Sequence, residues 1–167
     1  MSKTAATDVV TDTVVDIDLE TRLTERHHLP LRTWLRMLST TVKIETEIRT
    51  RLRNQFDTTL PRFDLMAQLE RHPKGLRMGE LSKRMMVTSG NITGIADQLE
   101  KEGLVARVVD QSDRRSFSLK LTRPGLTAFK KMAQVHELWV DELLDGLAPE
   151  QQQQLLQLLS MLKARLP

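Results

Sequence analysis

Residues 87–105, VTSGNITGIADQLEKEGLV, decide the fold of this chain. Their apolar side chains recur at steps of three and four residues, the period of an amphipathic helix: Ile92, Ile95, Ala96 and Leu99. Thr88 is suited to cap the first turn, and Gly103 follows where glycine commonly ends a helix. The stretch therefore predicts a helix over residues 89–102.

The polar face of this helix has the composition of a surface that reads DNA. Two glycines, Gly90 and Gly94, fall in its first two turns, and glycine inside a helix costs about 1 kcal/mol relative to alanine. Close approach of a partner to the backbone would compensate for that cost. The free N–H groups of the first turn favour a phosphate, and short hydroxyl and amide side chains contact base edges: Ser89, Asn91, Thr93 and Gln98. An ordinary capped amphipathic helix is the alternative.

The flanking segments predict a helix-turn-helix followed by a β-hairpin. A short helix over 79–85 precedes the tight turn, and strands over 104–109 and 116–122 follow it. The hairpin turn, DQSDRRS at 110–116, carries three charged residues at its tip: Asp113, Arg114 and Arg115. Arginine is favoured in narrow minor grooves, and an aspartate can orient it. This order of elements is that of a winged helix-turn-helix, and simple solvation of the turn charges is the alternative interpretation of the tip.

The distribution of charge favours a polyanionic partner. Residues 1–70 carry a net charge of −1, residues 71–131 carry +7, and residues 132–167 carry −3. A basic middle segment suggests a nucleic-acid-binding module. Candidate phosphate contacts are Arg77, Lys83 and Arg84, with Arg107, Lys120 and Arg123 nearby. Double-stranded DNA is the expected partner.

Long amphipathic helices are predicted on both sides of this module. One runs from Pro30 to about Phe56, others begin at Pro61 and Pro124, and the last begins at Pro149. The last helix is apolar over a wide arc, which needs cover on more than one side. We expect a mainly α fold with a small β-hairpin (α+β), arranged as a flexible arm (1–28), a helical dimerisation region (29–58 and 123–167) and a winged helix-turn-helix region (59–122). A homodimer is expected, and a monomeric bundle is the alternative.

Composition excludes several other classes of protein. The sequence has no apolar run of membrane-spanning length, and the acidic first 20 residues do not resemble a signal peptide. The chain contains no cysteine, so no disulfide or thiol switch is available. No nucleophile elbow, phosphate loop or metal motif is evident. We expect a cytoplasmic protein without enzymatic activity, membrane contact, bound metal or cofactor.

The residues at 87–105 resemble the recognition helix of the MarR family (multiple antibiotic resistance regulators). The stretch 110–116, followed by LKLT at 119–122 and Gly125, is similar to the wing of that family. The resemblance implies a triangular homodimer on a pseudo-palindromic operator, with recognition helices in major grooves and Arg115, oriented by Asp113, in the minor groove. It also implies a repressor released by anionic ligands. The NITG run at 91–94 resembles regulators of aromatic-acid degradation, some of which sense CoA thioesters.

A ligand pocket is expected between the long first helix, the second helix and the helix that begins at Pro124. Methionine and tryptophan suit an aromatic guest, and an anionic ligand needs a cation such as Arg32, Arg36, His28 or Arg62. The candidate pocket residues are Arg32, Trp34, Arg36, Leu38, Phe63, Met66, Met85, His136 and Trp139. Core packing is the competing interpretation of each apolar or aromatic member. A ligand-insensitive activator or anti-silencing factor, and a winged helix that binds protein, remain alternative functions.

Overall fold

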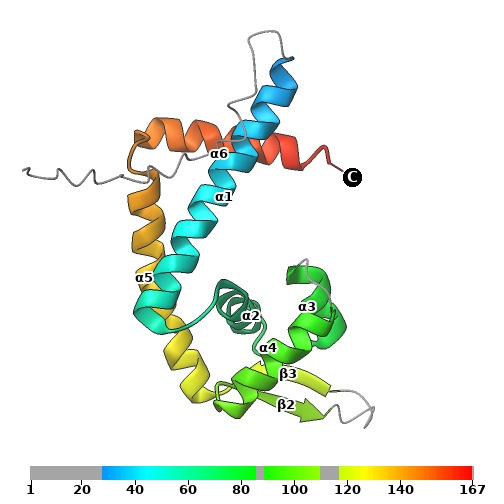
Figure 1. Ribbon diagram of the computed structural model, residues 1–167. Coiled ribbons are helices and arrows are strands. Elements are labelled where there is room, and N and C mark those ends of the chain that lie inside the picture. The colour runs from blue at the N-terminus through cyan, green and yellow to red at the C-terminus, as the bar shows by residue number, and fades with distance from the viewer. Residues whose placement is uncertain (1–27, 86–88, 110–116, 167) are drawn as a thin grey trace, which may run out of the picture. The chain divides into compact units, whose positions relative to one another are not determined.

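The computed structural model describes residues 28–85, 89–109 and 117–166. Contacts divide the chain into two units, residues 1–43 and 44–167. Helix α1 (Leu29–Phe56) runs from the first unit into the second. The second unit then contains, in chain order (Figure 1), α2 (Leu60–Glu70), β1 (Leu76–Arg77), α3 (Met78–Met85), α4 (Ser89–Lys101), β2 (Val105–Val109), β3 (Phe117–Leu121), α5 (Arg123–Leu144) and α6 (Pro149–Lys163). The predicted class, mainly α with a small β element, is confirmed.

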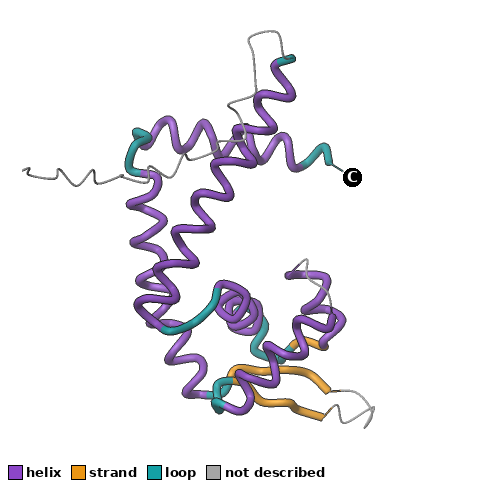
Figure 2. Tube along the Cα trace, viewed as in Figure 1, coloured by secondary structure: helices purple, strands orange, loops and turns teal. Residues whose placement is uncertain are grey.

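The sheet is small and antiparallel, and it has one strand more than the expected hairpin. Its strand order is β1-β3-β2, so β3 lies in the middle, as the orange segments of Figure 2 show. Val105 pairs with Leu121 and Val109 with Phe117 across β2 and β3. The two residues of β1 pair with β3 at Leu119 and Ser118. The segment between α2 and α3 is thereby attached to the sheet.

The core of the second unit is formed by α2, α3, α4 and the sheet, together with side chains from the C-terminal half of α1 and from α5. Its largest fully buried side chains are Leu52, Leu65, Met66, Leu69, Leu81, Ile92, Leu99, Val105 and Leu119. Ile92, Ala96 and Leu99 are each 0% exposed, which confirms the predicted inward face of α4. Burial of this face orients the opposite, polar face of the helix toward solvent.

The start of α5 is attached closely to the end of α4. The Thr122 hydroxyl accepts a hydrogen bond from the Gly125 N–H at 3.0 Å, and it donates to the Gly103 carbonyl at 2.7 Å. A Cβ built on Gly125 would lie 1.8 Å from the Leu104 carbonyl oxygen. Only glycine therefore fits at this crossing.

Helix α6 has no buried residue. Its apolar side chains remain between 42% and 60% exposed within the chain: Leu155, Leu156, Leu158, Leu159, Met161 and Leu162. Near the start of α1, Leu29, Leu31 and Trp34 are also exposed. In the described part of the chain, no helix combines the length and the hydropathy needed to cross a membrane.

Candidate nucleic-acid interface and adjoining cavity

The exposed face of α4 carries part of the predicted reading surface. Thr93, Gly94 and Gln98 are exposed on this helix, opposite its buried side. The backbone of residues 89–91 is helical, whereas the side chains of Ser89 and Asn91 and the exposure of Gly90 fall outside the description. Thr88 and the hairpin turn with Asp113, Arg114 and Arg115 lie outside the described residues altogether.

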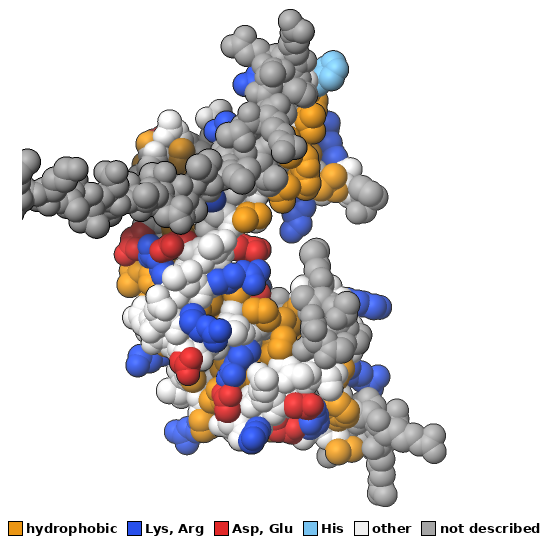
Figure 3. Space-filling model, in the orientation of Figure 1, with side chains coloured by type: hydrophobic (Ala, Val, Ile, Leu, Met, Phe, Trp, Pro, Cys, Tyr) orange, Lys and Arg blue, Asp and Glu red, His pale blue; other side chains and the backbone are white. Residues whose placement is uncertain are grey.

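Basic side chains are exposed on the elements that precede α4. Arg77, Lys83 and Arg84, the predicted phosphate contacts, are all exposed. The Arg77 N–H donates to the Glu80 carboxylate at 3.0 Å, at the start of α3. Figure 3 shows basic and acidic side chains interspersed over the visible face of this unit. The basic groups on α3 are suited to hold a DNA backbone, because lysine and arginine neutralise phosphates irrespective of sequence.

Arg107 on β2 has a role that the sequence did not reveal. Its guanidinium forms ion pairs with Asp97 and Glu100 of α4 and lies 5.2 Å from the ring centre of Phe117. The hydrogen bond to Asp97 raises the pKa of Arg107. We considered Arg107 as a phosphate contact from the sequence, but in the structure it ties α4 to the sheet. These partners are only seven to ten residues away, but they lie on different elements, so the period of a single helix or strand contains no signal for them.

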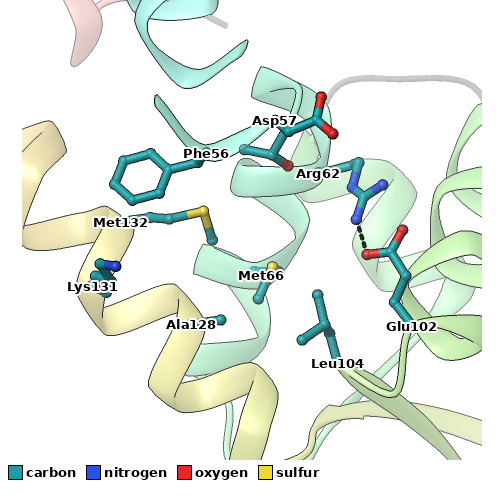
Figure 4. A pocket seen from close by; sticks show the side chains of 10 residues that line it. Phe56, Asp57, Arg62, Met66, Glu102, Leu104, Ala128, Lys131 and Met132 are labelled. Carbon is teal, nitrogen blue, oxygen red and sulfur yellow. Dashed lines mark hydrogen bonds and ion pairs between the residues drawn. The ribbon is translucent and has the colours of Figure 1, made fainter. Parts of the chain in front are cut away.

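A cavity of about 420 Å³ lies beside the C-terminal end of α4. Its walls come from the end of α1, from α2, from the α4–β2 connection and from α5, as Figure 4 shows. The lining residues are Phe56, Asp57, Thr58, Arg62, Met66, Glu102, Leu104, Ala128, Lys131 and Met132. The cavity combines apolar and sulfur-containing walls with two cations, Arg62 and Lys131, and two carboxylates, Asp57 and Glu102, a lining that suits a small ligand with an apolar body and a polar group.

The predicted pocket residues separate into three groups. Met66 lines the cavity, as does Arg62, one of the cations considered from the sequence. Phe63, His136, Trp139 and Met85 are not among the lining residues of this cavity. Every lining residue of the cavity lies in the second unit, whereas the remaining candidates lie in the first unit: Arg32, Trp34, Arg36 and Leu38.

The aromatic candidates pack against one another instead. The ring centres of Phe63 and His136 are 4.9 Å apart, and those of His136 and Trp139 are 6.4 Å apart. Phe63 also lies 5.5 Å from Phe129, and Trp139 lies 6.1 Å from Phe56. Burial lowers the pKa of His136. The contacts support the core-packing interpretation for Phe63, His136 and Trp139.

Comparison with known proteins identifies the family. The model of the MarR family matches residues 58–117, which include α2, α3, α4 and β2. Over 112 residues the chain is 30% identical to the HTH-type transcriptional regulator YfiV of Bacillus subtilis, a match that covers 67% of this chain and 69% of YfiV. The chain belongs to the MarR family. Members of this family are transcriptional regulators and not enzymes.

Other family members match different portions of the chain. The regulator YkoM of Bacillus subtilis is 34% identical over 50% of this chain, which spans about half (54%) of YkoM. The transcriptional activatory protein BadR of Rhodopseudomonas palustris is 37% identical over 36% of this chain and 34% of BadR.

Solved structures of the family share the fold. A MarR-family regulator from Silicibacter pomeroyi is 33% identical and has a TM-score of 0.67, with 85% of this chain and 96% of that chain covered. Sco3205 of Streptomyces coelicolor, solved in complex with DNA, is 25% identical and has a TM-score of 0.70, with coverages of 80% and 84%.

Proposed function

We propose that this MarR-family protein is a homodimeric regulator that binds a pseudo-palindromic operator in the cytoplasm and acts as a repressor released by a small aromatic acid. The observation that carries the DNA-binding part is the exposed polar face of α4. Its opposite face is anchored by the fully buried Ile92, Ala96 and Leu99. A related chain, Sco3205, has been solved in complex with DNA.

Each part of the interface has a proposed role. Side chains at the start of α4 contact base edges in the major groove, and Gly90 and Gly94 allow the backbone to approach. Arg115, oriented by Asp113, enters the minor groove. The remaining contacts cap the helix or hold phosphates: Thr88, Arg77, Lys83, Arg84 and Arg114.

The test begins with duplexes selected by the purified protein from a random library. Arg115→Ala should weaken binding to all selected duplexes, because it removes a minor-groove contact. Asn91→Ala should lose discrimination by about 1–3 kcal/mol, the worth of a bidentate base contact. Arg165→Ala, a charge removal near the C-terminus, is the control. Equal losses of Asn91→Ala on selected and random DNA would refute the reading role of Asn91.

The dimeric part of the proposal rests on the uncovered apolar side chains of α6. Leu156 is 59% exposed within the chain, and a second copy would remove this surface from water. Leu156→Glu should convert the dimer to monomers without loss of helix content, since the side chain contributes nothing to the core of its own chain. Sedimentation and circular dichroism measure both outcomes. A variant that sediments as the wild type contradicts the placement of the interface.

The effector part rests on the cavity beside α4. Its volume, about 420 Å³, falls within the range of small-molecule sites, and Arg62 and Lys131 supply positive charge beside the carboxylates of Asp57 and Glu102. A single aromatic acid fits this space, whereas the nucleotide of a CoA thioester would extend outside it. Titration calorimetry with benzoate, substituted benzoates and their CoA esters distinguishes the two. Absence of binding at millimolar concentrations across the panel would end the effector proposal.

Activation is the second candidate for the direction of regulation. The relative BadR carries the description of a transcriptional activatory protein, although the match covers about a third of either chain. A reporter gene placed behind a selected operator decides between the two. Expression that falls when the regulator is present, and recovers with the acid, supports repression.

A further inference from the structure

An ion pair lies at the wall of the cavity, between Arg62 of α2 and Glu102 at the end of α4. Figure 4 shows the two side chains meeting across the opening above Leu104. The Arg62 side chain is 16% exposed and that of Glu102 is 44% exposed. The pair therefore joins a largely buried cation to an acid that remains in contact with water.

Arg62 is incompletely satisfied in this pair. A terminal nitrogen, Nη2, holds the Glu102 carboxylate, whereas Nε is buried and has no hydrogen-bond partner among the described residues. A guanidinium binds a free carboxylate most strongly through two parallel N–H groups. Glu102 accepts a hydrogen bond from Nη2 of Arg62. A carboxylate placed to accept from both Nη2 and Nε would gain a second hydrogen bond.

Glu102 follows directly on the last residue of α4. Its own N–H still donates to the Gln98 carbonyl at 3.1 Å, so the backbone here continues the turn of the helix. The pair with Arg62 consequently links the end of α4 to α2. Loss of this pair would remove a direct polar link between the cavity wall and the helix that we propose to contact DNA.

We propose that the Glu102 carboxylate binds the Arg62 guanidinium when no effector is present, and that the carboxylate of an aromatic acid displaces Glu102 from Arg62. The entering carboxylate takes the Nε edge of Arg62, and repulsion between the two anions drives Glu102 into solvent. The apolar walls formed by Met66, Leu104 and Met132 receive the ring. This inference rests on the proposed effector function and adds the competing group that couples the cavity to α4.

Coupling of this kind is reciprocal. If the protein binds operator more weakly once Glu102 has left Arg62, then operator-bound protein must bind the aromatic acid more weakly by the same factor. Removal of the Glu102 charge should weaken operator binding, as the effector would, and should strengthen binding of the effector itself. These opposite effects on two ligands distinguish a competitor from a residue that only stabilises the fold.

The experiment uses the full-length protein, benzoate as the probe and a selected operator duplex. Glu102→Gln should bind benzoate about tenfold more tightly and operator about tenfold more weakly than the wild type, a coupling of ordinary size. Arg62→Gln should lose benzoate binding, and Arg62→Lys should recover little of it, because lysine lacks the two-point geometry. Glu137→Gln, an exposed acid of α5 that is not a lining residue, should match the wild type. Thermal melting checks that each variant is folded.

The outcomes separate this inference from the function on which it rests. If benzoate binds the wild type and Glu102→Gln equally, the effector site stands and the competition is refuted. If benzoate binds neither protein, both the competition and the aromatic-acid effector are refuted, while operator binding by the same preparations still tests the DNA-binding role. If the wild type binds no duplex DNA, the proposed regulator function itself fails.

Discussion

Replacement of Gly94 by alanine separates the stability of α4 from its contact with DNA. Gly94 lies inside α4 on its exposed side. A Cβ built on this residue meets no heavy atom within 4 Å beyond the adjacent helix backbone, so alanine fits the isolated protein without displacement of a neighbour. Any reason for glycine at this position must come from a partner.

The size of the expected effect on stability follows from the helical environment. Alanine is favoured over glycine inside a helix by about 1 kcal/mol, and no steric cost offsets this gain. A change of about 1 kcal/mol raises the melting temperature of a protein of this length by roughly 2–4 °C. Gly94→Ala should therefore be more stable than the wild type.

The expected effect on DNA binding has the opposite sign. If the backbone of α4 approaches the duplex at Gly94, an added methyl group forces the helix away from the groove. Insertion of one methyl group into a well-packed contact costs about 1–3 kcal/mol, which corresponds to a loss of operator affinity of roughly 5- to 150-fold. Gly94→Ala should thus raise the stability of the protein and lower its affinity for operator.

Urea denaturation and fluorescence anisotropy on a selected operator measure the two effects. Gly146→Ala, in the connection between α5 and α6, is the control, because its Cβ also meets no heavy atom within 4 Å. The control should bind operator as the wild type does. A Gly94→Ala protein that is more stable and binds operator with unchanged affinity would refute the close-approach argument.

Three further substitutions test other contacts of the second unit. Gly125→Ala should lower the free energy of unfolding by about 3 kcal/mol, because its Cβ would lie 1.8 Å from the Leu104 carbonyl oxygen; a wild-type urea midpoint contradicts this. His136→Phe should flatten the decline in stability from about pH 7 to pH 5, since burial lowers the pKa of His136 and the folded protein loses stability as this histidine is protonated; parallel pH profiles contradict it. Arg107→Gln should reduce the free energy of unfolding by about 1 kcal/mol and speed amide exchange in α4, and unchanged exchange would show that the ion pairs to Asp97 and Glu100 do not restrain the helix.

The elements of the fold were predictable because their signals are local. The apolar period from Ile92 to Leu99 specifies which side of α4 is buried. Gly103, with a φ of 72°, adopts the left-handed conformation that commonly ends a helix. Pro61, Pro124 and Pro149 each lie within the first turn of a helix.

Features that depend on distant partners were not predictable from the sequence. The pairing of Leu76 with Leu119 adds a strand that a run of two residues cannot signal. The ion pairs of Arg107 and Arg62 join elements that local periodicity treats separately. Likewise, a helical stripe marks Phe63 and Met66 equally as inward-facing, but it cannot show that the first fills the aromatic cluster and the second lines the cavity.

These non-local contacts have a consequence for how α4 can respond to a ligand. Its apolar anchors are fully buried, and burial is not directional, so a small shift of the helix can leave them covered. The arginine pairs are directional, because a guanidinium fork holds a carboxylate only in a narrow geometry. Arg107 holds Asp97 and Glu100 in the C-terminal half of α4, and Arg62 holds Glu102, the residue that directly follows the helix. Of the two arginines, Arg62 alone lines the cavity, so the proposed ligand would break the pair with Glu102 and leave the pairs of Arg107 with α4 in place.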